Sequence, residues 1–199
     1  MNAALRDELL RMDARDQAVR AELAADGSLW KGYVPRMEKV HREHATRLRE
    51  IIAKVGWPGQ TLVGPDGATA AWRIAQHSIG EPDFMRWCLK LLGEASQRGD
   101  APRWQFAMMD DRIRTFEGRP QRYGSQLRDT VNGLAPYPLE DPARVEEWRQ
   151  EVGLPRLGEL LSGLREEPPP SAEEIAAREA AELEWRRRVG WLPSSGGPP

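Results

Sequence analysis

The sequence AWRIAQHSIGEPDFMRWCLKLL, residues 71–92, predicts two helices that meet at a tight turn. In its first half, apolar residues recur at the spacing of one face of an α-helix. The second half begins at Pro82, whose fixed φ suits a first helical turn. Its apolar residues Phe84, Cys88 and Leu91 repeat at the same helical spacing. A hairpin this apolar must pack against further helices, so the stretch predicts a mainly α-helical fold.

Two polar residues, Gln76 and His77, lie beside the apolar face of the first helix of this hairpin. A polar side chain that is carried into a helical core needs a hydrogen-bond partner there. We therefore take Gln76 and His77 as the first candidates for a functional site.

The composition predicts one domain without a polyanionic partner. The 199 residues are 40% hydrophobic and 30% charged, which suffices for a sizeable core. The net charge of -2 gives no general attraction to nucleic acid or to an anionic membrane. The single cysteine, Cys88, excludes an internal disulfide and a cysteine-only zinc site. Neither a signal-peptide pattern nor a run of about 18 apolar residues is present, so we expect a cytoplasmic protein without membrane contact.

Amphipathic segments predict the other helices. The first begins at Asn2, a good N-cap, and its apolar stripe is interrupted by Asp16. A loop over residues 59–66 leads into the central hairpin, with Asp66 as the expected N-cap of its first helix. The expected helices of this bundle-like domain, about seven in all, span residues 2–26, 36–55, 67–78, 82–98, 102–117, 142–152 and 155–164.

One small β-hairpin is expected near residues 125–139. Two short extended segments flank Asn132-Gly133, the pair that best supports a type I′ turn. Pro136 and Pro138 restrict the second arm to a sheet edge.

The C-terminal part predicts an extension of the helical domain. We place the domain at residues 1–165, followed at 166–199 by a proline-rich spacer, a helix and a disordered tail. Ser171 and Glu174 form the capping-box pattern of that last helix. Its apolar stripe is thin, so we expect it to dock weakly or to bind a partner.

An ordered set of motifs between residues 36 and 157 resembles a widespread bacterial family of uncharacterised proteins, filed as a domain of unknown function. The resemblance implies no activity, and only indicates that the polar positions in these motifs belong to one recurring pattern. The motifs are Gly56-Trp57-Pro58, Ala71-Trp72 with Gln76-His77, Cys88-Leu89, Asp111-Arg112, Pro120-Gln121-x-Tyr123-Gly124-x-Gln126 and Pro138-x-Glu140-Asp141.

The matching polar residues predict a small-molecule pocket. His77 is the candidate general base, and Asp111 is placed to orient it or to accept its proton. Arg112 suits a carboxylate or phosphate group, because a guanidinium binds such groups through two parallel hydrogen bonds. The predicted ligand-binding residues are Gln76, Arg112, Gln121, Tyr123 and Gln126. In the alternative interpretation these residues are structural, with His77 satisfied by Asp111 or Tyr123.

Histidine and carboxylate side chains also raise the question of a metal site. His41, His44, His77 and Asp111 offer ordinary ligands for zinc or iron. Glu38-x-x-His41 matches half of a di-iron signature, but the second half is missing. We therefore assign no metal site and name no cofactor.

Two functions follow from this sequence. The first is a cytosolic enzyme or ligand-binding domain whose pocket takes a small polar or anionic ligand; the sequence leaves the reaction open. The second is a protein-interaction module that binds a partner through its N-terminal or C-terminal helix. Neither involves nucleic acid or a membrane.

Overall fold

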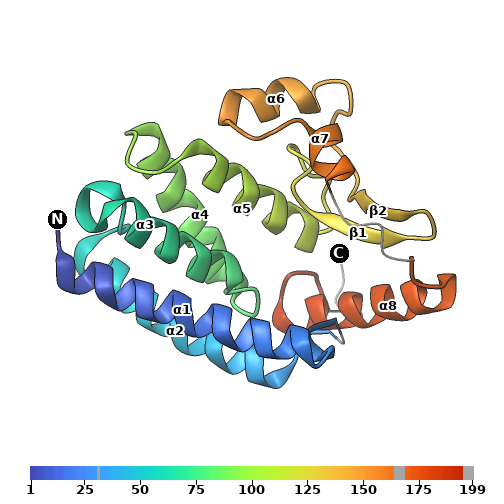
Figure 1. Cartoon of the computed structure of the whole chain (residues 1–199), viewed down its shortest axis with the longest axis horizontal. Coiled ribbons are helices and arrows are strands. Elements are labelled where there is room, and N and C mark those ends of the chain that lie inside the picture. The colour runs from blue at the N-terminus through green and yellow to red at the C-terminus, as the bar shows by residue number, and fades with distance from the viewer. Residues whose placement is uncertain (31, 164–168, 195–199) are drawn as a thin grey trace. The chain divides into compact units, whose positions relative to one another are not determined.

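A computed structural model describes residues 1–30, 32–163 and 169–194. These residues form eight α-helices, one short 3-10 helix (η1) and one antiparallel two-stranded sheet (Figure 1). The elements, in chain order, are α1 (Ala3–Ala25), η1 (Ser28–Trp30), α2 (Pro35–Val55), α3 (Gln60–His77), α4 (Pro82–Gln97), α5 (Arg103–Phe116), β1 (Leu127–Thr130), β2 (Gly133–Pro136), α6 (Val145–Val152), α7 (Leu157–Ser162) and α8 (Ala172–Val189). The predicted fold class, mainly helical with one small β-hairpin, is confirmed.

The chain divides into two compact units, residues 1–102 and 103–199. The first contains α1 to α4, and the second contains α5 to α8 with the β-hairpin. Within the described parts of both units, we find no helix with the length and hydrophobicity needed to cross a bilayer.

The first unit is built on three helices that pack pairwise, α1, α2 and α3. Each buries an apolar stripe against the other two, as Leu9, Leu48 and Val63 illustrate with no exposed surface. Asn2 caps α1 as predicted, because its side-chain oxygen accepts a hydrogen bond of 3.1 Å from the Leu5 N–H. This three-helix packing fixes the positions of polar side chains that the helices carry inward.

The start of α3 differs from the prediction. We expected a loop over residues 59–66, but α3 begins at Gln60 and continues through a kink at Gly64, whose φ is 75°. The first turn is capped from a distance, since the Thr61 N–H donates to Asp100 Oδ1 at 2.6 Å. Asp66, the expected N-cap, instead binds the Arg6 guanidinium, with 2.9 Å between its Oδ1 and Arg6 Nε. A cap supplied by a residue so far along the chain leaves no local signal.

In the second unit, the β-hairpin forms as predicted, but its turn lies one residue earlier. Thr130 pairs with Gly133, so Val131 and Asn132 form the turn. In the described residues, positive φ is confined to glycines, which excludes the type I′ turn that we expected at Asn132-Gly133. Thr130 closes the turn instead, because its hydroxyl donates to the Gly133 carbonyl at 2.7 Å.

The last helix, α8, packs on strand β1 of the same unit. Its capping box is confirmed, with Ser171 and Glu174 exchanging side-chain and backbone hydrogen bonds. The helix also joins the strand through an ion pair of 2.8 Å between Arg178 and Asp129. Partner binding by this helix stays a prediction. Residues 164–168 and 195–199, which hold much of the expected spacer and tail, lie outside the described residues.

Candidate functional site

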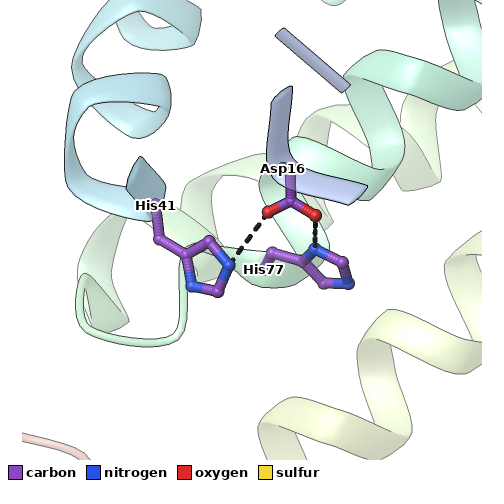
Figure 2. Close-up of side chains that lie close together, drawn as sticks. All are labelled: Asp16, His41 and His77. Carbon is purple, nitrogen blue, oxygen red and sulfur yellow. Dashed lines mark hydrogen bonds and ion pairs between the residues drawn. The ribbon is translucent and has the colours of Figure 1, made fainter. Parts of the chain in front are cut away.

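Helices α1, α2 and α3 bring together one carboxylate and two imidazoles, Asp16, His41 and His77 (Figure 2). Asp16 lies between the two rings and turns one oxygen toward each. Its Oδ1 is 2.9 Å from His41 Nε2, and its Oδ2 is 2.8 Å from His77 Nδ1. One potential ligand atom from each residue lies within 4.8 Å of the other two. We call these three residues the Asp-His-His cluster.

Helical periodicity explains why these side chains point inward. Asp16 lies two helical turns after Leu9 and two turns before Leu23, so it occupies the buried stripe of α1. His41 lies on the buried face of α2, and His77 is the last residue of α3. The side chain of Asp16 is 3% exposed and that of His77 is 17% exposed, so the cluster is most accessible at His77.

Two further side chains hold the cluster in place. The Tyr33 hydroxyl lies at hydrogen-bond distance, 2.9 Å, from His41 Nδ1, and its ring stacks on the imidazole. The Gln17 amide donates to Asp16 Oδ2 at 3.0 Å. Both nitrogens of His41 therefore face a polar atom, which fixes the orientation of the ring.

The cluster stabilises the ionised form of Asp16. Burial alone raises the pKa of this carboxyl, but the contacts with His41 and His77 outweigh burial and hold the pKa below its usual range. Asp16 is therefore a carboxylate at neutral pH, in a place where an uncompensated negative charge would be costly.

One contact in the cluster lacks hydrogen-bond geometry. Asp16 Oδ1 and His41 Nε2 are both shielded from solvent, and neither makes a hydrogen bond with the described residues although they lie 2.9 Å apart. A proton on His41 Nε2 would be shared with Asp16 Oδ1 and would lower the pKa of the carboxyl. If instead the ring is neutral and the Tyr33 hydroxyl accepts the proton of His41 Nδ1, then Nε2 presents a lone pair toward the carboxylate oxygen. Two electron-rich atoms this close need a cation or a proton near both. Two imidazole nitrogens and a carboxylate are common ligands of divalent transition metals.

Asp111 has a different environment, in the second unit. It is fully buried on α5, and its carboxylate accepts three backbone hydrogen bonds from the following loop. The donors are the N–H groups of Arg122 at 2.8 Å, Tyr123 at 3.0 Å and Ser125 at 2.9 Å. Burial raises the pKa of Asp111, and these three bonds oppose that shift. The carboxylate anchors the loop to α5.

The other polar residues predicted in this unit join the same loop. The buried amide of Gln121 donates to the carbonyls of Gln126 and Tyr137, and its oxygen accepts the Gln126 N–H. Arg112 Nε donates to the Gln126 side chain at 3.1 Å. Arg149, which sequence reasoning did not single out, is 1% exposed and donates to the carbonyl of Tyr123 at 2.6 Å.

The seven predicted site residues therefore divide between the two units. Gln76 and His77 belong to the first unit, where Gln76 is 2% exposed. The other five, Asp111, Arg112, Gln121, Tyr123 and Gln126, belong to the second, where they surround one loop. The single pocket that would unite them stays a prediction.

Sequence reasoning did not assign Asp16 a role. A signal was present, because an acidic residue that interrupts an apolar helical stripe must find a partner in the core. Its partners lie 25 and 61 positions further along the chain, and only the packing of the helices identifies them.

The comparisons with known proteins identify a family. No match to the chain is found among the curated proteins or among the solved structures. One family model, described as a family of unknown function (DUF6624), matches residues 3–167. This match covers most of the chain and includes every residue of the Asp-His-His cluster and of the Asp111 loop. The chain therefore belongs to the DUF6624 family.

Proposed function

We propose that the Asp-His-His cluster binds a divalent transition-metal ion and that the chain is a metal-dependent enzyme acting on a small polar molecule. The observation that carries this proposal is the contact of 2.9 Å between Asp16 Oδ1 and His41 Nε2, two buried atoms without a hydrogen bond to the described residues. A cation bound between them would satisfy both atoms and would neutralise the buried carboxylate.

The surroundings of His41 support metal binding. A histidine that binds a metal through one nitrogen usually makes a hydrogen bond through the other, which fixes its tautomer and its orientation. The Tyr33 hydroxyl supplies this partner at His41 Nδ1. Gln17 gives Asp16 a comparable support, because its amide donates to Oδ2.

The number of ligands favours a catalytic rather than a structural metal. Structural zinc sites use four protein ligands, whereas catalytic sites use three and keep a position for water or substrate. The cluster provides two imidazoles and one carboxylate, a set that suits Zn²⁺ or Fe²⁺. Such an ion supplies Lewis acidity and lowers the pKa of a bound water.

One contact favours a second candidate function, in which His77 is a general base without a metal. Asp16 Oδ2 lies 2.8 Å from His77 Nδ1, an arrangement that orients an imidazole and stabilises its protonated form. In this account Asp16 takes the orienting role that the sequence analysis gave to Asp111. The three backbone bonds of Asp111 support a structural role for that residue.

The metal proposal is tested by isothermal titration calorimetry of the full chain after EDTA has stripped bound metal and has been removed. The chain is titrated with Zn²⁺ and, under anaerobic conditions, with Fe²⁺. We expect one ion per chain. His77→Asn and Asp16→Asn should each weaken binding by more than about tenfold, since even the loss of an outer hydrogen-bond partner costs that much. For the same reason Tyr33→Phe should weaken binding by about tenfold.

Asp13→Asn is the matched control, because Asp13 lies on the same helix but pairs with Arg73 rather than with the cluster. It should bind the metal like the parent protein. Circular dichroism shows whether each variant is folded, and His77→Asn is the decisive variant because its side chain is the most exposed of the three. Absence of stoichiometric binding, or equal binding by the parent and His77→Asn, would overturn the metal site and favour the general-base account.

A further inference from the structure

A surface groove of about 330 Å³ lies along the seam between α1 and α2. Two ion pairs that link the helices frame it. At one end, Arg15 contacts Glu43 at 2.8 Å. At the other end, Arg47 binds Glu8 through two nitrogens, at 2.5 and 3.2 Å. Because the two helices run antiparallel, the residues that line the groove between these pairs lie side by side.

The middle of the groove contains a cation and an imidazole without ion-pair partners. Arg11 is exposed and forms no hydrogen bond or ion pair with the described residues. His44 is 5% exposed, and its Nδ1 is shielded from solvent without a hydrogen-bond partner in the described parts of the chain. Burial lowers the pKa of His44, so the imidazole is neutral at physiological pH and carries one N–H donor. Met12 adds an apolar surface beside them.

The acidic side chains of the groove make their hydrogen bonds and ion pairs with Arg47 and Arg15, although the charge of Arg11 also acts on Glu8. Arg47 holds the pKa of Glu8 below its usual range, so Glu8 is an ionised partner of Arg47. Glu43 is likewise engaged by Arg15. The N–H groups of Arg11 therefore remain available to bind a group from outside the chain, since its interaction with Glu8 involves no hydrogen bond.

We propose that this groove binds a small molecule through an oxyanion group, a carboxylate or a phosphate. The guanidinium of Arg11 makes two parallel hydrogen bonds to such a group, and His44 donates a further one. Met12 contacts the apolar part of the ligand, and the two flanking ion pairs hold the walls of the groove in position. The volume is at the lower end of the range for small-molecule sites.

The groove does not depend on the proposed metal. None of its lining residues belongs to the Asp-His-His cluster, and none of the interactions that we assign to the ligand involves a metal ion. A test in the presence of EDTA therefore separates the two proposals.

The site is tested by titrating the full chain with inorganic phosphate and, separately, with acetate. Binding is monitored through the NMR shifts of backbone amides, in the presence of EDTA and at constant ionic strength. We expect saturable binding of at least one probe, and the tighter probe identifies the oxyanion. Arg11→Gln should weaken binding by about tenfold or more, as expected for the loss of hydrogen bonds to a charged group. His44→Leu should weaken it as well.

Arg20→Gln is the matched control, because Arg20 is an exposed arginine of α1 outside the groove and the substitution changes the net charge equally. It should leave binding within about twofold of the parent, since a distant surface charge is screened by salt. Absence of saturable binding by both probes would overturn the proposal. An equal loss of affinity in Arg11→Gln and Arg20→Gln would also overturn the proposal, because it would show that binding depends on the net charge of the chain and not on Arg11.

Discussion

Replacement of Asp111 by alanine tests whether this residue is structural, because its carboxylate is the shared acceptor for a whole loop. The N–H groups of Arg122, Tyr123 and Ser125 all donate to it. In Asp111→Ala these donors lose their acceptor while the rest of α5 is unchanged. We expect a large loss of stability and a loosened loop.

The magnitude follows from the burial of the three donors. The bond from Tyr123 is buried and the other two are partly buried, and leaving a buried donor unsatisfied costs about 1–3 kcal/mol. Burial raises the pKa of Asp111, so removing the ionised group also relieves a desolvation cost. We expect a net decrease of about 3 kcal/mol in the free energy of unfolding.

Urea denaturation followed by tryptophan fluorescence and circular dichroism measures this decrease. Asp110→Ala is the matched control, because Asp110 precedes Asp111 on the same helix and gains the same helical propensity. Its carboxylate makes one partly buried bond of 2.8 Å to Arg114, so its loss should cost about 1 kcal/mol, less than the loss of three buried or partly buried bonds. Equal losses in the two variants would refute the reasoning. An unchanged stability of Asp111→Ala with a loss of ligand or activity would instead restore the catalytic role predicted from the sequence.

Three further substitutions test other features. Burial lowers the pKa of His44 in the folded chain, so the unfolded chain binds the proton more tightly. The free energy of unfolding should therefore fall as the pH drops below about 6.5. In His44→Gln the urea midpoint should differ less between about pH 7.5 and about pH 5.5 than it does in the parent protein. Equal differences in parent and variant would contradict this. Gly124→Ala should lower the melting temperature by an amount equivalent to about 1–2 kcal/mol, because φ is 65° there and a Cβ would lie 3.1 Å from Leu157 Cδ2. An unchanged melting temperature would show that the loop can adjust. Ser171→Ala should destabilise α8 by about 1 kcal/mol, because the capping box with Glu174 is lost. Limited proteolysis should then cut within the helix faster than in the parent protein. Ser171→Asp, which keeps a capping side chain, should be cut at the parent rate.

The parts of the fold that the sequence predicts are those with local causes. The helical hairpin at residues 71–92, the cap at Asn2 and the capping box at Ser171 each depend on residues within a few positions of one another. Spacing and capping chemistry therefore place these elements within a residue or two. The turn of the β-hairpin was displaced by one residue because the Thr130 side chain supports a different turn from the one that Asn132-Gly133 favours.

The candidate site has mostly non-local causes, and the sequence predicts less of it. His77 was found from its place beside an apolar face, but its carboxylate partner is Asp16 on another helix. Asp111 was selected as a partner of His77, but its carboxylate binds three backbone N–H groups of a loop in its own unit. A single sequence shows that a buried polar residue needs a partner, whereas only the packed helices show which residue supplies it.

The distant cap of α3 couples the start of α3 to the segment that follows α4. The N–H groups of Gln60 and Thr61 bond to the backbone and side chain of Asp100, which follows the end of α4. Local opening at Asp100 therefore releases the first turn of α3, and the amide protons of both segments should exchange with solvent through one shared opening. During synthesis this turn stays uncapped until residue 100 has left the ribosome. The N-terminal three-helix core therefore reaches its final form only after α4 has been made.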